Sequence, residues 1–173
     1  MAKDGLLRLA GASDVASLDI PASSRDYLVH VGLPDEEILG LRFNFLGSSL
    51  PTLEELAARV GFGPFPLNGS RPCLGFTNDV AVCIDEHCDG AVYCVDLAQE
   101  DPERFLNSRV EWLGSFLNMY VYHCINTNGF HDPDIDRAVL ELERRMREVD
   151  PVALDDPEHW WPLILEQMKD GLI

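Results

Sequence analysis

Asn107 and Ser108 are the first residues whose types could do chemistry, and they stand within PERFLNSRVEWLGSFLNMY (102–120). A serine nucleophile needs a base within hydrogen-bond reach and a third group that orients the base. No G-x-S-x-G turn surrounds Ser108. Ser108 and Glu111 instead have the spacing of a capping box at the start of a helix. The pair therefore predicts a joint between a strand and a helix rather than a catalytic centre.

Three cysteines and a histidine lie close together in the sequence: Cys83, His87, Cys88 and Cys94. Their spacing matches none of the common zinc patterns. If residues 86–90 form a hairpin loop, Cys83 faces Tyr93 and Val82 faces Cys94, so Cys83 and Cys94 lie on opposite faces of the sheet. We therefore expect no metal site, although a small hydrolase or metal enzyme that uses Cys83, His87 or Cys88 stays as the alternative. The odd total of five cysteines favours reduced thiols over a disulfide framework.

The chain carries 30 acidic and 13 basic residues, a formal net charge of −17. A surface of that sign repels nucleic-acid backbones and favours fast capture of a basic partner, although solubility alone would also explain it. The candidate partner contacts are six acids that we expect to be exposed: Asp35, Glu36, Glu37, Asp85, Glu86 and Asp89. The last three would form a hairpin tip, and they lack the spacing of a calcium loop.

The composition excludes several classes of protein. Hydrophobic residues make up 46% of the 173 residues and charged residues 25%, which is typical of a globular domain. No apolar run reaches the roughly 18 residues that span a membrane, and the N-terminal residues lack the apolar core of a signal peptide. Glycine-rich phosphate-binding motifs are absent from the sequence. We expect a cytoplasmic protein without a cofactor.

The first part of the chain predicts short helices and strands. The segments are a helix within 21–34, a strand over 39–46, a helix over 51–61 and a loop over 62–72. Ser23 or Ser24 is expected to cap the first helix and Gly32 to end it. Thr52 and Glu55 have capping-box spacing at the start of the second helix. Strands over 73–78, 79–85 and 90–97 follow, and 102–107 is predicted as a short fourth strand.

Three helices are predicted to finish the chain: 109–125, 133–149 and a last one from Asp156-Pro157 to about Lys169. Ser108 and Asp132 are the expected N-caps of the first two. Two i,i+4 ion pairs are predicted on the middle helix: Glu141–Arg145 and Glu143–Arg147. Trp160 and Trp161 point about 100° apart on a helix, so we expect one to be buried and the other to lie near the surface.

The order of motifs resembles the SUKH superfamily of bacterial immunity proteins, most closely its fourth family. The matching segments are YLVHVGLP (27–34), PTLEEL (51–56), CLGFTNDVAVCIDEHCDGAVYCVDL (73–97) and RFLNSRVEWLGSFLNMY (104–120). Family members open the long helix with Phe-x-Asn-Ser-Ser, which Phe105, Asn107 and Ser108 match, whereas Arg109 replaces the usual second serine. Cys94-Val95-Asp96 follows the Val-Leu-Asp region of the family only loosely.

The resemblance implies an α+β fold, with a central, largely antiparallel sheet of about four to six strands packed by helices. It implies one domain over 1–173, with a core of about 20–125 and a helical extension over 126–173. It also implies a protein without catalytic activity, which binds and neutralises a cognate bacterial toxin, often a nuclease or deaminase. A regulatory scaffold that binds another protein through the same sheet is a further reading.

Overall fold

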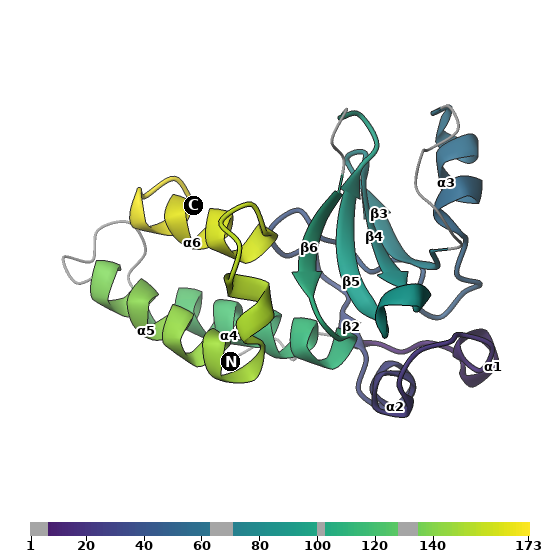
Figure 1. Ribbon diagram of the computed structural model, residues 1–173, viewed down its shortest axis with the longest axis horizontal. Coiled ribbons are helices and arrows are strands. Elements are labelled where there is room, and N and C mark those ends of the chain that lie inside the picture. The colour runs from purple at the N-terminus through teal and green to yellow at the C-terminus, as the bar shows by residue number, and fades with distance from the viewer. Residues whose placement is uncertain (1–6, 63–70, 100–102, 128–134) are drawn as a thin grey trace.

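A four-stranded antiparallel sheet lies at the centre of the computed structural model, which describes residues 7–62, 71–99, 103–127 and 135–173 (Figure 1). Its strands, in spatial order, are β3 (Cys73–Thr77), β4 (Val80–Asp85), β5 (Ala91–Asp96) and β6 (Glu103–Asn107). All four predicted strands are confirmed, with differences only at their ends. The predicted register between β4 and β5 is confirmed too, because Cys83 pairs with Tyr93 and Val82 with Cys94.

The two faces of this sheet carry separate cores. One face packs against the C-terminal helices through Val82, Ile84, Val92, Cys94 and Leu106. The other face, with Cys73, Ala81, Cys83 and Val95, packs against α3 (Leu53–Val60) through Leu53, Leu56 and Ala57. Figure 1 shows α3 on the side of the sheet away from the C-terminal helices. Cys83 and Cys94 therefore lie on opposite faces, as the register predicts.

The N-terminal part consists of a two-stranded ribbon and two short helices. The ribbon pairs β1 (Leu7–Arg8) with β2 (Leu33–Pro34), and the helices are α1 (Ala12–Val15) and α2 (Ala22–His30). The prediction that a serine caps α2 is wrong. Pro21 is the N-cap, and the hydroxyls of Ser23 and Ser24 donate to Glu111 instead, at 2.8 and 2.7 Å. Gly32 follows the helix with a φ of 79°, and its amide donates to the carbonyl of Tyr27.

The predicted strand over 39–46 is wrong. Leu39 and Gly40 have φ angles of 54° and 76°, so the chain reverses tightly there and Ile38 pairs with Leu41. The alternation of leucine and phenylalanine reflects burial rather than a strand, because Leu41 and Phe43 are fully buried.

The segment that follows this turn runs along the free edge of β3. The Phe45 amide donates to the Leu74 carbonyl at 3.1 Å. The side-chain amide of Asn44 both accepts from the Phe76 amide and donates to the Phe76 carbonyl, at 2.9 and 3.2 Å. A side chain at Gly75 would overlap the carbonyl oxygen of Arg42, so the approach requires glycine there.

Helix α3 begins and ends as predicted. The Thr52 hydroxyl accepts from the Glu55 amide, and the Glu55 carboxylate accepts from the Thr52 amide, which completes the capping box. Gly61 ends the helix with a φ of 87°. The segment predicted as a loop after this helix falls mostly outside the described residues, apart from its ends.

The three predicted C-terminal helices are confirmed as α4 (Val110–Asn126), α5 (Ile135–Val149) and α6 (Trp160–Lys169), and a short 3-10 helix, η3 (Pro151–Leu154), joins the last two. The predicted cap at Asp132 lies outside the described residues. Helix α6 begins later than predicted, with His159 as its N-cap, because the Asp156 carboxylate accepts from the Glu158 amide in a preceding turn.

Two side-chain predictions for these helices have different outcomes. Trp161 is fully buried and Trp160 only partly, as expected for neighbours on a helix. The Glu143–Arg147 pair is present, but Glu141 pairs with Arg144 rather than Arg145. None of the helices in the described ranges is long and apolar enough to cross a membrane.

Candidate functional site

Asn107 and Ser108 meet a buried carboxylate at the junction between β6 and α4. Asp150 is fully buried and accepts from the Asn107 side-chain amide at 3.0 Å, the Ser108 backbone amide at 2.8 Å and the Ser108 hydroxyl at 2.9 Å. The Asn107 side-chain carbonyl accepts from the indole of Trp161 at 3.0 Å. The pair therefore joins β6 and α4 to the end of α5 and to α6.

The arrangement is the predicted structural joint, but the predicted capping box is wrong. Arg109 is the N-cap of α4 and provides no side-chain cap, whereas Glu111 binds Ser23 and Ser24 on α2. The Ser108 hydroxyl donates to Asp150, and within the described residues no imidazole is found hydrogen-bonded to it. The carboxylate that holds Ser108 also accepts from the Asn107 side chain and the Ser108 backbone amide, an arrangement that fits a structural network.

The cysteine and histidine cluster is spread over three environments. Cys83 is buried under α3, Cys94 is buried on the opposite face of the sheet, and His87 and Cys88 are exposed in the 3-10 turn η1 (Glu86–Cys88). Burial raises the pKa of Cys83 well above its ordinary value and that of Cys94 to about 12, which disfavours the thiolate needed for attack or metal binding. No group of three or more metal-binding side chains is assembled in the parts of the chain that the structure describes.

The predicted acidic hairpin tip is only partly exposed. The expectation that Asp85 is exposed is wrong: only 5% of it is accessible, and it pairs with Arg71 at 2.8 Å and accepts from the His87 amide at 2.9 Å. Glu86 accepts from the backbone amide of Asp19 at 2.7 Å. The carboxylate of Asp89 is 74% exposed and pairs with Arg109 at 2.8 Å. Arg71, the Asp19 amide and Arg109 thus each bind one acid of the tip, and Asp89 is the most accessible of the three acids.

Arg71 is the residue near the tip that the sequence does not single out. Its guanidinium bridges Asp85 and Glu103 and lies 5.1 Å from the centre of the Tyr93 ring. Burial, with contributions from Cys88, Glu103 and Asp85, raises the pKa of Tyr93 to about 12. Arg71 follows a Gly- and Pro-rich stretch that predicts only a loop, so no signal in the sequence pointed to this pairing.

The second acidic group consists of Asp35, Glu36 and Glu37, and Glu37 contacts the end of β3 that lies away from the tip. Asp35 pairs with Arg8, Glu36 is exposed, and the carboxylate of Glu37 accepts from the hydroxyl of Thr77 at 3.4 Å. Thr77 precedes the β3–β4 turn, whereas Asp85 ends β4, so roughly 17 Å of strand separates Glu37 from the tip. The six predicted acids therefore do not form one continuous site.

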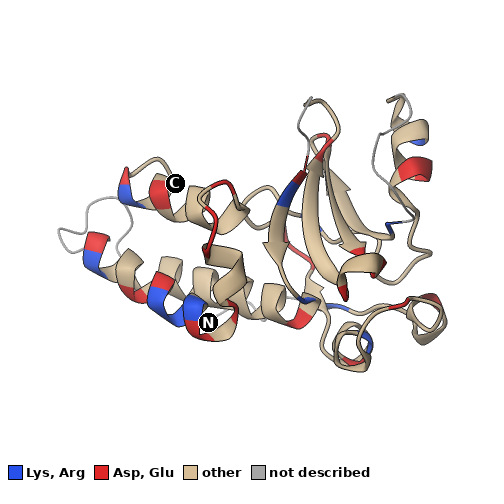
Figure 2. Ribbon diagram, in the orientation of Figure 1, with Lys and Arg blue, Asp and Glu red and all other residues tan. Residues whose placement is uncertain are grey.

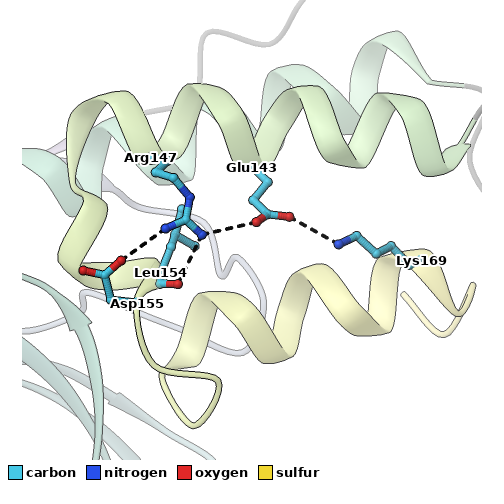
Figure 3. Close-up of polar contacts among 5 residues, drawn as sticks. All are labelled: Glu143, Arg147, Leu154, Asp155 and Lys169. Carbon is cyan, nitrogen blue, oxygen red and sulfur yellow. Dashed lines mark hydrogen bonds and ion pairs between the residues drawn. The ribbon is translucent and has the colours of Figure 1, made fainter.

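A shallow cleft lies between α5 and α6, and a chain of ion pairs crosses it (Figure 3). Glu143 accepts from Arg147 at 3.3 Å and from Lys169 at 3.2 Å, and Arg147 also binds Asp155 and the Leu154 carbonyl. The cleft has a volume of about 370 Å³. Its lining consists of Glu143, Leu154, Pro157, Pro162, Leu165, Glu166 and Lys169. The ion pairs hold α5, η3 and α6 in place, each with the modest strength of a surface pair.

The sequence model of one protein family, described as SUKH-4 immunity protein, matches residues 1–167. The chain belongs to the SUKH-4 immunity protein family. This membership confirms the resemblance on which the expected fold was based and supports an immunity role for the SUKH-4 protein. Comparisons with curated proteins and with solved structures found no match.

Most described basic side chains of this SUKH-4 protein form ion pairs within the chain. These residues are Arg8, Arg71, Arg104, Arg109, Arg144, Arg147 and Lys169. Figure 2 shows the result on α5, where basic and acidic segments lie next to one another. Because acidic residues outnumber basic ones by so much, these pairs leave a large surplus of negative charge for solvent or a partner.

Proposed function

We propose that this SUKH-4 protein binds a cognate toxin in the cytoplasm and blocks it without chemistry. The observation that carries the proposal is the family match over residues 1–167. We further propose that the toxin is a basic nuclease or deaminase. The net charge of −17 supports this step, because enzymes that act on nucleic acids present positive charge to phosphates.

The proposed mechanism is steric and electrostatic. Acidic side chains would occupy the phosphate-binding surface of the toxin, and the surplus negative charge would speed association. Glu36 and Glu37 are the first candidate contacts, since both are exposed and pair with no cation within the described ranges. Asp35, Glu86 and Asp89 would contact the toxin at the edge of the interface. Asp85 would act indirectly, by holding the tip through Arg71.

We propose that the whole chain acts as a single unit. Support comes from the main core, in which Val139 of α5 and Trp161 of α6 pack together with Val92 of the sheet and Phe116 of α4. A toxin bound at either acidic group would then contact a rigid body.

The first test is capture of the partner from lysate of the source cells on the immobilised full chain, with elution by rising salt. We expect a single basic nuclease or deaminase that salt releases, and co-expression of the SUKH-4 protein should protect cells from it. A single partner that resists salt would keep the binding role and remove the electrostatic mechanism. Failure to capture any partner, together with stoichiometric zinc in the purified protein, would favour the Cys/His enzyme instead.

A charge-reversal pair locates the contact once the toxin is in hand. Glu36→Lys with Glu37→Lys is compared with Asp26→Lys with Asp170→Lys, because both variants change the net charge equally and all four positions are exposed. General steering would slow association equally in both variants. A direct contact at Glu36 and Glu37 would raise the dissociation rate at least tenfold in the first variant alone. Equal rates in the two variants would exclude that contact.

A further inference from the structure

Cys73 on β3 and Cys83 on β4 are directly opposite each other in the sheet. The Ile84 amide donates to the Pro72 carbonyl at 3.0 Å, one residue outside the pair on each strand. Cys73 and Cys83 are therefore a non-hydrogen-bonded antiparallel pair, the kind in which the two Cα atoms are only about 4.5 Å apart. That separation lies within the range that disulfides span, about 4.4 to 6.8 Å.

The two thiols already point toward each other. Their Sγ atoms are 3.0 Å apart, and both residues are fully buried and free. A disulfide would need the sulfurs to approach by about 1 Å more. The other cysteines are placed differently, since Cys94 lies on the opposite face of the sheet and Cys88 and Cys124 are exposed. Geometry thus selects one pair among the five cysteines.

We propose that Cys73 and Cys83 form a reversible disulfide with a small-molecule disulfide as the oxidant, independently of the proposed toxin binding. One cysteine, as thiolate, attacks a sulfur of the oxidant; the oxidant's S–S bond breaks and a first small thiol leaves. The second cysteine then attacks the mixed disulfide on the protein, forms the Cys73–Cys83 bond and releases a second small thiol. The protein loses two electrons and two protons, and the oxidant is reduced to two thiols.

Burial sets the rate of this reaction rather than its direction. Burial, and then the contact with Cys73, keeps the pKa of Cys83 high, so little thiolate exists at neutral pH. Oxidation therefore requires α3 and the residues just before it to move away from the two thiols. This segment is held against β3 by the Cys73 amide, which donates to the Pro51 carbonyl at 2.8 Å, and by the Leu53 amide, which donates to the Arg71 carbonyl at 2.9 Å. Once formed, the disulfide would lie beneath α3 and tie β3 to β4.

The test uses the folded full chain, oxidised glutathione, alkylation of remaining thiols and digestion before aspartate residues under non-reducing conditions. Cleavage before Asp79, Asp85 and Asp89 places each of Cys73, Cys83, Cys88 and Cys94 in a different peptide. We expect a linked Cys73–Cys83 peptide that forms at least tenfold faster in mild urea, and a higher Tm for the oxidised protein.

Two variants keep the result interpretable. Cys88→Ser should leave the link intact, whereas Cys73→Ala should abolish both the link and the gain in Tm. The proposal would be overturned if the glutathione mixed disulfide at Cys88 or Cys124 were the only product while Cys73 and Cys83 stayed alkylatable after unfolding. A link from Cys88 to either buried cysteine would overturn it as well. Because the main measurement uses the unaltered chain, a variant that fails to fold does not affect the result.

Discussion

Two carboxylates are buried in this protein by different means, Asp150 at the joint of the C-terminal helices and Asp85 at the hairpin tip. Asp150 is surrounded by neutral donors, since Asn107 and Ser108 together give it three hydrogen bonds. Asp85 relies on the cation of Arg71, with one further bond from the His87 amide. The first arrangement is a hydrogen-bond network and the second is a buried ion pair.

The difference determines which residues can be replaced together. A buried ion pair can often be exchanged for neutral residues at little cost, whereas removal of one partner leaves an uncompensated charge. Donors around Asp150 have no such exchange, because one of them is a backbone amide that cannot be removed. The joint is therefore the less replaceable of the two, and variants at each position can separate the two cases.

The largest effect is expected for Asp150→Ala. The Asn107 side-chain amide, the Ser108 backbone amide and the Ser108 hydroxyl would lose their acceptor. The free energy of unfolding should therefore fall by roughly 3–5 kcal/mol. Equilibrium unfolding in urea measures this loss. Asp155→Ala is the matched control, since the exposed carboxylate of Asp155 forms a surface pair with Arg147, and it should cost less than about 1 kcal/mol. Equal losses in the two variants would mean that the network does not hold the joint.

An intermediate effect is expected for Arg71→Met. The variant leaves Asp85 buried without its cation, and the free energy of unfolding should fall by about 2–4 kcal/mol. Adding Asp85→Asn removes the charge and keeps an oxygen for the His87 amide, so the double variant should regain more than half of the loss. A double variant no more stable than Arg71→Met alone would argue that Arg71 acts through Glu103 and Tyr93 rather than through Asp85.

The smallest effect concerns His123, which is buried on α4 with an Nε2 atom that has no hydrogen-bond partner within the described residues. Burial lowers its pKa below the ordinary value of about 6.5. At a pH below about 6.5, His123 binds a proton more readily in the unfolded chain than in the folded one. The free energy of unfolding therefore decreases as the pH falls from about 6.5 through the pKa of the folded state.

His123→Leu should flatten this dependence while stability at pH 7.5 stays unchanged or rises slightly. Urea midpoints between pH 7.5 and pH 5 provide the measurement, and His30→Leu, at an exposed position, is the control. Identical pH profiles for the His123 variant and the unaltered protein would assign the acid sensitivity to other groups.

The β3–β5 strands and their register could be predicted because local signals agreed. Alternating apolar residues set the faces, and Asn78-Asp79, with φ angles of 47° and 66°, forms a tight turn of the kind those residue types favour. The segment around Leu41 and Phe43 misled the prediction, since its alternation comes from burial without a strand partner. Nothing in the local sequence indicates the left-handed φ of Leu39 that turns the chain there.

At the candidate sites, residue types were easier to predict than their partners. Ser108 has the spacing of a cap, but Asp150, remote in sequence, accepts from its hydroxyl and also from the Ser108 backbone amide, the donor that the Glu111 carboxylate would have used in a capping box. The local sequence predicts that Asp85 is a surface acid, but in the structure it pairs with Arg71, whose guanidinium lies over the Tyr93 ring. In both cases tertiary contacts outweighed a correct local pattern, and only the three-dimensional structure identifies the partner.

The contacts of Asn44 with Phe76 bear on how this protein behaves at high concentration in a crowded cell. An exposed edge strand offers unpaired backbone groups to any other chain that can extend alongside it, which is a common route to aggregation. Here the outward backbone groups of Phe76 and the Leu74 carbonyl are already satisfied from within the chain. Neighbouring copies therefore find these three backbone groups already bonded, which disfavours addition of a further strand at this part of the β3 edge.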